Sequence, residues 1–561
     1  MPKNVMKLAK PSPHRARNDF DLSHRHVMSM NFGEIIPVTT IETVPGDFIE
    51  MSAADLIRAI PLVTSPFLRA KQHLDVWFVP YHDLWHNFEN FMIKKSQPVS
   101  SALRDWTYLP WVNLYDLWDT TQASTDKDIV GRDLKDGAAR LLNYLGYGYA
   151  KLGTQGTQVS VNPFRLAAYQ YIWYNEYRQQ YYDDGMNASN GNVPNASYMF
   201  NFDSKQCNTL ANAQITTLNP EVINMMCQLR YRTWKKDLYT GLMPSTQFGN
   251  VSTVSGTLTD LVRLQSSNNA SGSLSSNSQG YFIHTDGGGN ASNQWKLTSG
   301  NYTEITTDVD ILALRKSEAI QIWRENSLRA GNRVKDNMLA HYGVDSDFRD
   351  HRPTYLGSVD SPLNIGDVMT TANSTTGVND TVGDVAGKGL SSLDEKVFKF
   401  NAKDFGVIMV MASILPEAEY NAEGVSRMNQ LLEAEDFFVP EYENLGLEAV
   451  SSQNFKNTAT TAAKVIGYAP RYFGYKTKLD KCYDLFKTGG INSPWCSPKY
   501  DVSTALGTPP AVLPLSTLYV NPKIFDVNFS VGVDVQPQFL CDFYFDVDAV
   551  RPMSVVGLPF S

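Results

Sequence analysis

The sequence contains few charged residues and lacks an excess of positive charge. Charged side chains make up 19% of its 561 residues, against a usual share of about 25%. The 58 acidic residues outnumber the 49 basic ones, which gives a formal net charge of −9. A protein that coats nucleic acid through its bulk charge is expected to be basic. The composition excludes that class.

Long apolar runs are also missing. The longest strongly apolar stretch, FGVIMVMASIL, covers residues 405–415 and is far shorter than the roughly 18 residues that a membrane-spanning helix needs. The N-terminal segment MPKNVMKLAKPSPHRAR is basic, but it has no apolar region of the kind found in secretory signals. We therefore expect neither membrane insertion nor export.

Cysteine is scarce, and its spacing is irregular. The five cysteines are an odd number and never form a C-x-x-C pair; they are Cys207, Cys227, Cys482, Cys496 and Cys541. This pattern argues against a disulfide framework and against a structural zinc cluster, and it favours a reducing compartment.

Aromatic and apolar residues are abundant, with 42% hydrophobic residues, 28 Tyr and 27 Phe, and this favours sheet-rich packing. Strand-like patterns occupy residues 35–80 and much of 397–561, and within 539–548 apolar and polar residues alternate. Helical patterns lie between these regions. Strands so far apart in sequence predict non-local pairing, in a β-sandwich or jelly roll with long insertions.

Helices are expected in the intervening sequence, near residues 83–91, 133–145, 163–182 and 308–342. Asp83 is a plausible N-cap for the first, and Gly331 predicts that the last is kinked or divided. Residues 250–303 are rich in Ser, Asn and Gly and indicate a surface insertion.

Motifs for catalysis are weak. His82 and His86 have the i, i+4 spacing of a zinc pair, but Asp83 is too short to replace the usual Glu, and packing of the neighbouring aromatic residues explains the segment better. The acidic residues Glu417, Glu419 and Glu423 could serve glycoside hydrolysis, although a solvated face is the simpler interpretation. A carbohydrate-active β-sandwich protein, either a glycosidase or a sugar-binding module, therefore remains the alternative function.

Three carboxylates on one face of the last strand, Asp542, Asp546 and Asp548, could hold a hard cation such as Ca2+. No cofactor is otherwise required.

Two basic clusters are candidates for contact with DNA. The first is an N-terminal arm, residues 1–18, with Lys3, Lys7, Lys10, Arg15 and Arg17. The second mixes positive charge with aromatic rings, a combination suited to single-stranded nucleic acid. It consists of Arg230, Arg232, Lys235 and Lys236 with Tyr231, Trp234 and Tyr239.

Several segments in collinear order resemble the major capsid protein of microviruses, which are small icosahedral single-stranded DNA bacteriophages, and in particular its gokushovirus branch. They include FDLSHRHVMSMNFGEIIPVTTIETVPGDFIEM, NPFRLAAYQYIWYNEYR, RTWKKDLYTGLMPSTQFG, RYFGYKTKLDKCYDLF and VRPMSVVGLPF. The similarity extends over nearly the whole chain, with gaps at the variable insertions.

The resemblance implies a single eight-stranded jelly roll over residues 19–561, with long helical and loop insertions. Sixty copies would form a T=1 icosahedral shell around a circular single-stranded DNA genome, and residues 250–303 are the candidate for the threefold surface protrusion that contacts the host receptor. Expected partners are a small basic DNA-binding protein, a pilot protein and an internal scaffolding protein. The expected location is the virion, assembled in the cytoplasm of the bacterial host.

Overall fold

The computed structural model describes fourteen segments of the chain: residues 17–85, 88–93, 109–148, 159–183, 220–247, 274–276, 282–285, 291–295, 311–331, 334–343, 352–369, 385–456, 464–498 and 515–555. They belong to two compact units. The larger comprises residues 1–246 and 347–561, and the smaller comprises residues 247–346.

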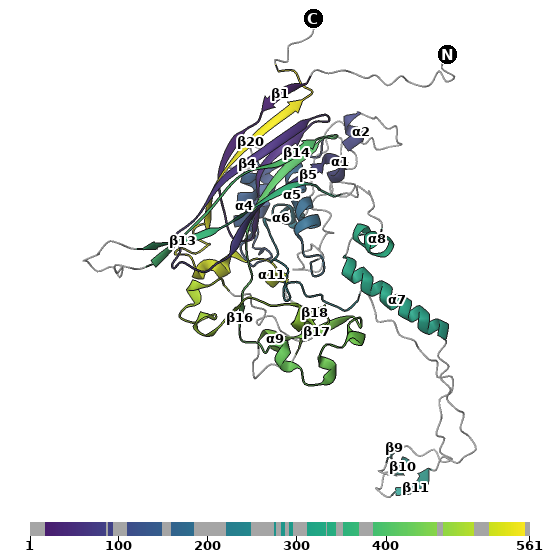
Figure 1. The fold of residues 1–561 in the computed structure, drawn as a ribbon. Coiled ribbons are helices and arrows are strands. Elements are labelled where there is room, and N and C mark those ends of the chain that lie inside the picture. Colours follow the sequence, from purple (N-terminus) through teal and green to yellow (C-terminus); the bar gives the residue numbers. More distant parts are fainter. Residues whose placement is uncertain are drawn as a thin grey trace, which may run out of the picture. The chain divides into compact units, whose positions relative to one another are not determined.

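Two antiparallel sheets form the centre of the larger unit (Figure 1). In the first sheet the strand order is β1-β20-β4-β14-β13, and β2 also pairs with β20. Its strands are β1 (Asn18–Asp21), β2 (His24–Met30), β4 (Phe48–Ala59), β13 (Asn364–Met369), β14 (Val385–Asn401) and β20 (Phe539–Arg551). The second sheet has the order β12-β5-β15-β3-β8. Its strands are β3 (Glu34–Thr43), β5 (Ala70–Pro80), β8 (Arg230–Tyr231), β12 (Thr354–Pro362) and β15 (Gly406–Pro416).

Eight of these strands have the connectivity of a jelly roll. In chain order they are β2, β3, β4, β5, β12, β14, β15 and β20, and they form the four-stranded arrays β2-β20-β4-β14 and β3-β15-β5-β12. This exchange of strands between two sheets is the double Greek key of jelly rolls. The predicted fold, mainly β with one eight-stranded jelly roll, is confirmed.

The core lies between the two sheets. The predicted alternation in β20 is confirmed, because one face of the strand is buried while the other is partly or fully exposed. The buried face consists of Phe539, Cys541, Phe543, Phe545, Val547 and Ala549. By contrast, β15 is buried on nearly every residue, since a helix packs against the outer face of its sheet.

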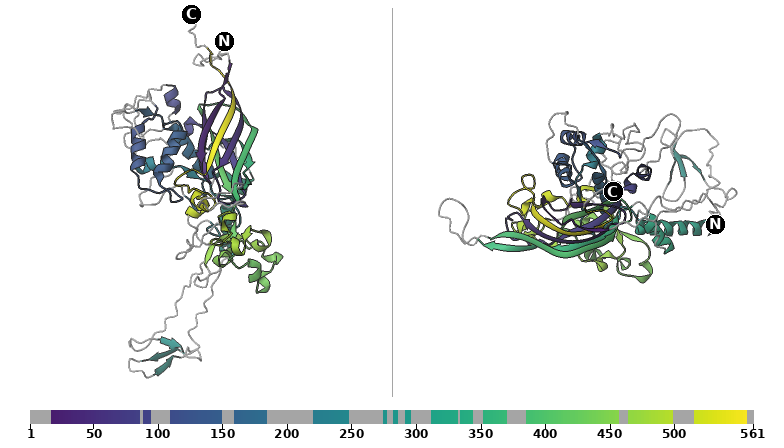
Figure 2. Two further views of the ribbon diagram at one scale, coloured as in Figure 1. Left: turned by 90° about the vertical axis from the view of Figure 1, so that its left-hand side faces the viewer. Right: turned by 90° about the horizontal axis from the view of Figure 1, so that it is seen from above.

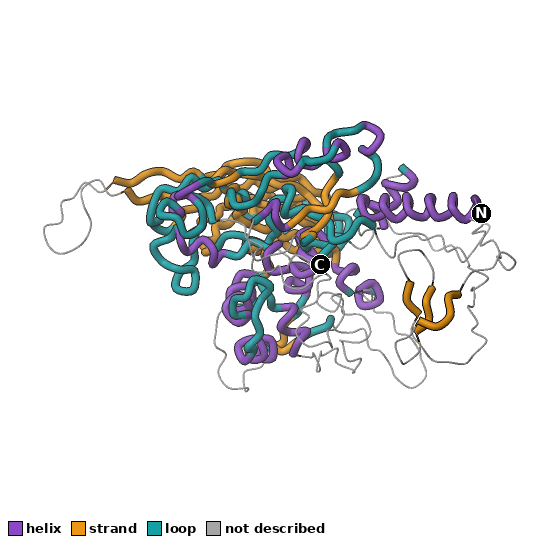
Figure 3. Tube along the Cα trace, turned by 90° about the horizontal axis from the view of Figure 1, so that it is seen from below, coloured by secondary structure: helices purple, strands orange, loops and turns teal. Residues whose placement is uncertain are grey.

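The layer that covers the second sheet is built from short helices. Its helix α5 (Phe164–Ile172) packs on β5 and β15, and α4 (Leu134–Tyr144) packs on β3. The helices of this layer stand to one side of the strands in the left view of Figure 2, and Figure 3 shows the strands of the two large sheets as one block with helices outside it. Further elements here are β6 (Val112–Asn113), α3 (Leu114–Ala123), β7 (Ser160–Val161), a π-helix (Trp173–Tyr177) and α6 (Pro220–Met226).

Two long connections interrupt the jelly roll. Residues 81–353 join β5 to β12, which are antiparallel neighbours, and Thr354 lies directly opposite Phe78. Residues 417–538 join β15 to β20. The short strands and α-helices of the second connection are β16 (Tyr420–Asn421), β17 (Leu447–Ser451), α9 (Ser452–Phe455), β18 (Val465–Pro470), α10 (Phe473–Lys476), β19 (Lys481–Cys482) and α11 (Leu515–Leu518). Its 3-10 helices are Arg427–Gln430, Ala434–Asp436, Pro440–Tyr442, Asp484–Phe486, Ser493–Trp495 and Pro522–Val527.

The prediction of one continuous helix over residues 83–91 is wrong. The structure divides it into α1 (Tyr81–Leu84) and α2 (Phe88–Met92), and Trp85 between them is extended, with φ −143° and ψ 105°. The N-terminal cap of α1 is Pro80 rather than Asp83. The zinc-like i, i+4 geometry needs a continuous helix, and the break at Trp85 removes it. His86 itself lies outside the described residues.

The smaller unit contains two helices and a three-stranded sheet. The helices α7 (Ile311–Ala330) and α8 (Val334–Tyr342) are separated at Gly331, whose φ of +114° suits glycine. The division predicted at this residue is confirmed. The sheet has the order β11-β10-β9, from β9 (Leu274–Ser276), β10 (Phe282–Thr285) and β11 (Ala291–Trp295). The sequence 250–303 falls entirely within this unit.

Among the residues that the structure describes, no helix combines the length and apolarity needed to cross a membrane.

Candidate nucleic-acid interface

A cleft of about 400 Å³ lies in the larger unit, where the start of β5, the segment after β8 and the end of β15 meet. It contains part of the second predicted basic cluster. The lining residues are Lys71, His73, Glu176, Tyr177, Arg232, Thr233, Trp234, Lys235, Lys236, Asp360, Leu415, Pro416 and Glu417.

Lysines carry the accessible positive charge of the cleft. Lys71, Lys235 and Lys236 are exposed. Lys235 Nζ lies 3.4 Å from Glu417 Oε1. An exposed pair of this kind is weak, so the ammonium group remains able to bind a phosphate. Lys71 was not predicted from the sequence, although the alternation of β5 places it on the exposed side of the strand.

Arg232 is held within the cleft by its neighbours. Its guanidinium donates hydrogen bonds to Asp75 Oδ2 at 3.2 Å and to Ser413 Oγ at 2.9 Å. Close by, His73 Nδ1 lies 2.6 Å from Asp360 Oδ1. Burial lowers the pKa of His73, and Arg232 lowers it further against the opposing effect of Asp360. The imidazole is therefore neutral at pH 7, and the lysines supply the charge.

The prediction that Arg230 faces DNA is wrong. Its side chain is buried because β8 pairs with β3 beneath the helices. The guanidinium donates to Gln170 Oε1 at 2.7 Å and lies 4.0 Å from the ring centre of Trp173. Burial lowers the pKa of Arg230 to about 10. The guanidinium is therefore part of the protein interior and does not reach a ligand.

The aromatic half of the predicted cluster is also buried. Tyr231, Trp234 and Tyr239 expose 1%, 3% and 5% of their surface. Their rings are unavailable for stacking on bases. What the cleft offers to a nucleic acid is phosphate contact by its cations, which lie beside the acidic residues Glu176, Asp360 and Glu417. Sequence spacing could not separate these cases, because strand residues next to an exposed lysine can point to either face.

Of the basic residues in the N-terminal arm, only the last lies within the part of the chain that the structure describes. Lys3, Lys7, Lys10 and Arg15 lie outside the described residues, whereas Arg17 is exposed and precedes β1, which begins at Asn18.

The prediction that Asp542, Asp546 and Asp548 together bind one cation is wrong. Asp542 forms an ion pair with Arg25 at 2.5 Å, and Asp546 accepts a hydrogen bond from Ser23 Oγ at 3.0 Å. At about 3.3 Å per residue, Asp542 and Asp548 are roughly 20 Å apart along the strand. One ion cannot bridge that distance.

Asp548 instead lies in a row of carboxylates across three strands. It is directly opposite Asp21 of β1 and Glu50 of β4. Although Asp548 is exposed, slight desolvation raises the pKa of its carboxyl group, and the neighbouring carboxylates of Asp19, Asp546, Asp21 and Glu50 raise it further. Like charges in register repel each other. Glu50 is offset by ion pairs with Lys396 at 2.8 Å and Lys399 at 2.9 Å, so the repulsion lies mainly between Asp548 and Asp21.

The glutamates considered for glycoside hydrolysis have separate partners. Glu417 pairs with Arg69 at 3.3 Å, and Glu423 pairs with Lys456 at 3.6 Å. Glu419 Oε2 accepts from the thiol of Cys482 at 3.3 Å.

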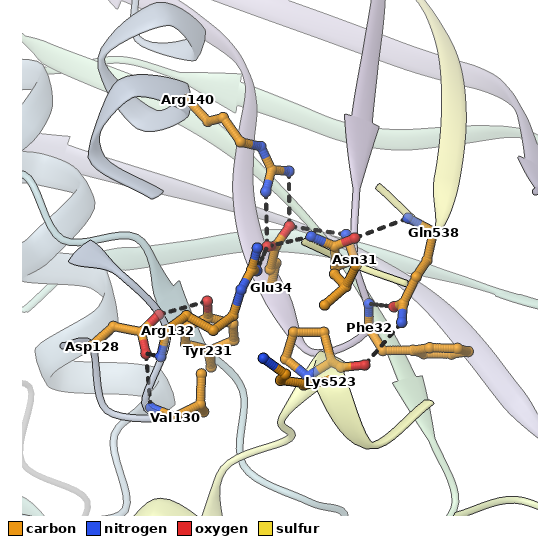
Figure 4. A network of polar contacts seen from close by, with 12 residues as sticks. Asn31, Phe32, Glu34, Asp128, Val130, Arg132, Arg140, Tyr231, Lys523 and Gln538 are labelled. Carbon is orange, nitrogen blue, oxygen red and sulfur yellow. Dashed lines mark hydrogen bonds and ion pairs between the residues drawn. The ribbon is translucent and has the colours of Figure 1, made fainter. Parts of the chain in front are cut away.

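A buried polar network that sequence reasoning missed joins the jelly roll to its helical layer (Figure 4). The carboxylate of Glu34 on β3 is fully buried and binds Arg140 of α4 at 2.8 Å and Arg132 at 3.0 Å. It also accepts hydrogen bonds from the side chain and backbone nitrogen of Asn31, at 2.7 and 2.9 Å. The network continues through Asn31 to Gln538.

Comparison with known proteins shows the family to which the chain belongs. Residues 9–560 match the family described as "Capsid protein (F protein)". The chain belongs to this family of capsid proteins. It is also similar to two proteins named Capsid protein VP1, from Chlamydia phage 1 and Bdellovibrio phage phiMH2K. Each is 23% identical to it, with coverage of 97% and 98% of this chain and 95% and 96% of the relatives. A third Capsid protein VP1, from Spiroplasma virus 4, is 21% identical over 64% of this chain and 62% of that protein.

These matches confirm the resemblance to the major capsid protein of microviruses. The capsid protein is a structural component of a virion rather than an enzyme, and it acts in a multimeric assembly. The glycosidase alternative is not supported. The exposed outer face of the first sheet and the cleft lysines are therefore surfaces of a capsid subunit.

Proposed function

We propose that sixty copies of the capsid protein form a T=1 icosahedral shell around a circular single-stranded DNA genome, assembled in the cytoplasm of the bacterial host. The observation that carries this proposal is a jelly roll of eight strands within a family match over nearly the whole chain. Closed point-group symmetry is the usual outcome for identical subunits. The size of the shell tests this directly.

Sixty chains of 62.7 kDa amount to about 3.8 MDa. Sedimentation and negative-stain microscopy of protein from cells that also express the internal scaffolding protein should give one discrete species of that mass. A monomer, or open sheets and tubes, under the same conditions would contradict the proposed shell.

The cleft lysines contact DNA phosphates in this proposal. Lys71, Lys235 and Lys236 are exposed around one cleft, with Arg232 behind them, and the N-terminal arm adds Lys3, Lys7, Lys10, Arg15 and Arg17. The net charge of −9 leaves most of the genome's charge to be balanced elsewhere. A small basic DNA-binding protein and divalent cations such as Ca2+ complete the neutralisation, and a pilot protein accompanies the genome.

Charge reversal tests this surface. Binding of a labelled oligodeoxythymidine to the soluble protein should weaken in the double variant Lys235→Glu, Lys236→Glu. Loss of two phosphate contacts should reduce the slope of log K against log salt by about 1.4, at about 0.7 per contact for single strands.

The matched control is the double variant Lys478→Glu, Lys487→Glu, which changes the net charge equally at exposed lysines of the 417–538 connection. If the slope of log K against log salt is the same for both double variants, the net charge of the protein alone determines DNA binding. That result would contradict a DNA site at the cleft.

Residues 250–303 form the threefold protrusion and contact the host receptor in this proposal. The support is their composition and their place in a compact unit separate from the jelly roll. Phage with this segment shortened should assemble particles of normal mass but adsorb poorly to the host. Normal adsorption would contradict the attachment role.

A further inference from the structure

Two cysteines and a glutamate that are distant in sequence meet in the 417–538 connection. The carboxylate of Glu419 and the thiols of Cys482 and Cys496 bring their ligand atoms within 4.8 Å of one another. Cys482 Sγ lies 3.3 Å from Glu419 Oε2. Residue spacing does not indicate this cluster, because Cys482 and Cys496 are fourteen positions apart and Glu419 is 63 positions before Cys482.

The backbone at each ligand is fixed by neighbouring segments. Strand β16 pairs in parallel with β19, so that Asn421 lies opposite Cys482. The carbonyl oxygen of Cys496 accepts a hydrogen bond from Asn528 Nδ2 at 3.0 Å. The three side chains are thus brought together by the fold, since they come from three separate segments.

The size and accessibility of the cluster suit a metal ion. With Zn–S bonds of about 2.3 Å and Zn–O bonds of about 2.1 Å, tetrahedral coordination puts ligand atoms about 3.5–3.8 Å apart. The observed separations need only small side-chain adjustments. Glu419 and Cys496 are 9% and 6% exposed, whereas Cys482 is partly exposed, which leaves one side of the cluster open for a water ligand.

The donor set selects the kind of ion. Two thiolate sulfurs and one carboxylate oxygen are soft and borderline ligands, which favour Zn2+ over Ca2+ or Mg2+. The latter prefer six or more oxygen atoms or retain several waters.

We propose that Glu419, Cys482 and Cys496 form a structural binding site for one divalent cation of the zinc type. Each thiol loses its proton to solvent when its sulfur binds the ion, so that two protons are released per ion and no electrons are transferred. The bound ion links β16, β19 and the segment after the 3-10 helix Ser493–Trp495. It therefore stabilises the connection between β15 and β20.

Metal content gives the first test. The protein is purified under reducing conditions without chelator, incubated with Zn2+, desalted and measured by inductively coupled plasma mass spectrometry. We expect one zinc per chain in the wild type, and affinity about tenfold or more weaker in Cys482→Ser, Cys496→Ser and Glu419→Gln. Cys227→Ala, at a buried cysteine outside the cluster, is the matched control and should retain the ion.

Cobalt and alkylation give readouts that report the ligands themselves. Co2+ added to the wild type should produce a thiolate-to-metal charge-transfer band that Zn2+ abolishes. In the wild type, Zn2+ should protect Cys482 and Cys496 from alkylation, as mapped by peptide mass spectrometry, so the test does not depend on folded variants.

Two results would overturn the site. One is a zinc content and cobalt spectrum that are the same in the wild type and the Cys482→Ser, Cys496→Ser double variant. The other is a Cys482–Cys496 disulfide in virions freshly released from cells, since oxidised sulfurs no longer act as thiolate ligands.

Discussion

Replacement of Glu34 by glutamine would remove one negative charge from the buried junction between β3 and the helical layer while hardly changing the size of the side chain. Glu34 Oε1 accepts from Arg132 and Arg140, and Oε2 accepts from Arg140 and from the backbone nitrogen of Asn31. In the glutamine variant an NH2 group must replace one of these oxygens. The NH2 group of the glutamine would then face the N–H groups that donate to the carboxylate in the wild type. Arg132 and Arg140 would also lose the negative charge that balances them.

The expected cost follows from this geometry. Removing one partner from a buried, hydrogen-bonded ion pair typically destabilises a protein by about 3–5 kcal/mol. Glu34 is completely buried, and the side chains of Arg132 and Arg140 are 14% and 20% exposed. Solvent therefore screens the interaction little, and we expect Glu34→Gln to fall within that range.

Lowering the pH should weaken the interaction of Glu34 with Arg132 and Arg140 in the wild type. Burial alone would raise the pKa of Glu34, but Arg140, Arg132 and Asn31 together lower it below its ordinary value. For a carboxyl group with a depressed native pKa, the stabilisation is present above the unfolded value of about 4.3 and is lost as the pH falls through the native value. The difference in stability between wild type and Glu34→Gln should therefore shrink below about pH 4.

Urea unfolding of the soluble, unassembled protein, followed by far-UV circular dichroism at pH 7 and at pH 3.5, measures both effects. The control is Glu443→Gln, which removes the carboxylate of an exposed pair with Lys476 at 3.6 Å and should cost no more than about 1 kcal/mol. If Glu34→Gln costs no more than this control, the network does not hold the helices to the jelly roll.

Three further changes have definite expected outcomes. Phe543→Ala, at a completely buried position between the sheets, should destabilise the protein by about 3–5 kcal/mol in the same urea assay, and a loss below about 1 kcal/mol would mean that the core repacks. Asp548→Asn should raise the melting temperature at pH 7, because the Asp548 carboxylate lies opposite those of Asp21 and Glu50 and its pKa is raised. The gain should vanish below about pH 4, and a melting temperature lower than that of the wild type at pH 7 would contradict the prediction. Gly33→Ala should lower the melting temperature, since Gly33 has a φ of +73° and an added Cβ would lie 2.5 Å from Val520 Cβ; a melting temperature equal to that of the wild type would show that the 520 segment can move away.

The jelly roll could be predicted from the sequence because its signals are local and regular. The alternation in 539–548 identified β20 and both of its faces, and glycine at 331 marked the division between α7 and α8. The break at Trp85 was not predictable in this way, since the surrounding residues favour one helix and the break depends on tertiary packing.

The site residues were harder to predict, because burial depends on contacts between distant segments. Arg230 and Lys235 are five positions apart in one basic cluster, but only Lys235 is exposed. What distinguishes them is the pairing of β8 with β3, which local sequence does not encode. The junction at Glu34 and the cluster at Cys482 have the same origin, since each joins residues more than sixty positions apart.

The connection of residues 81–353 leaves β5 at Pro80 and enters β12 at Thr354, beside its point of departure, because Thr354 and Phe78 are opposite each other. In topological terms, these 273 residues replace the turn of a hairpin. Loops of this connection outside the helical layer can be lengthened, shortened or exchanged while the two ends remain a strand's width apart, so the register of the eight strands need not change. The helical layer itself is constrained, because α4 and α5 pack on the second sheet and Arg140 neutralises Glu34. A virus with this subunit can therefore diversify those loops under selection while its shell-forming framework stays constant.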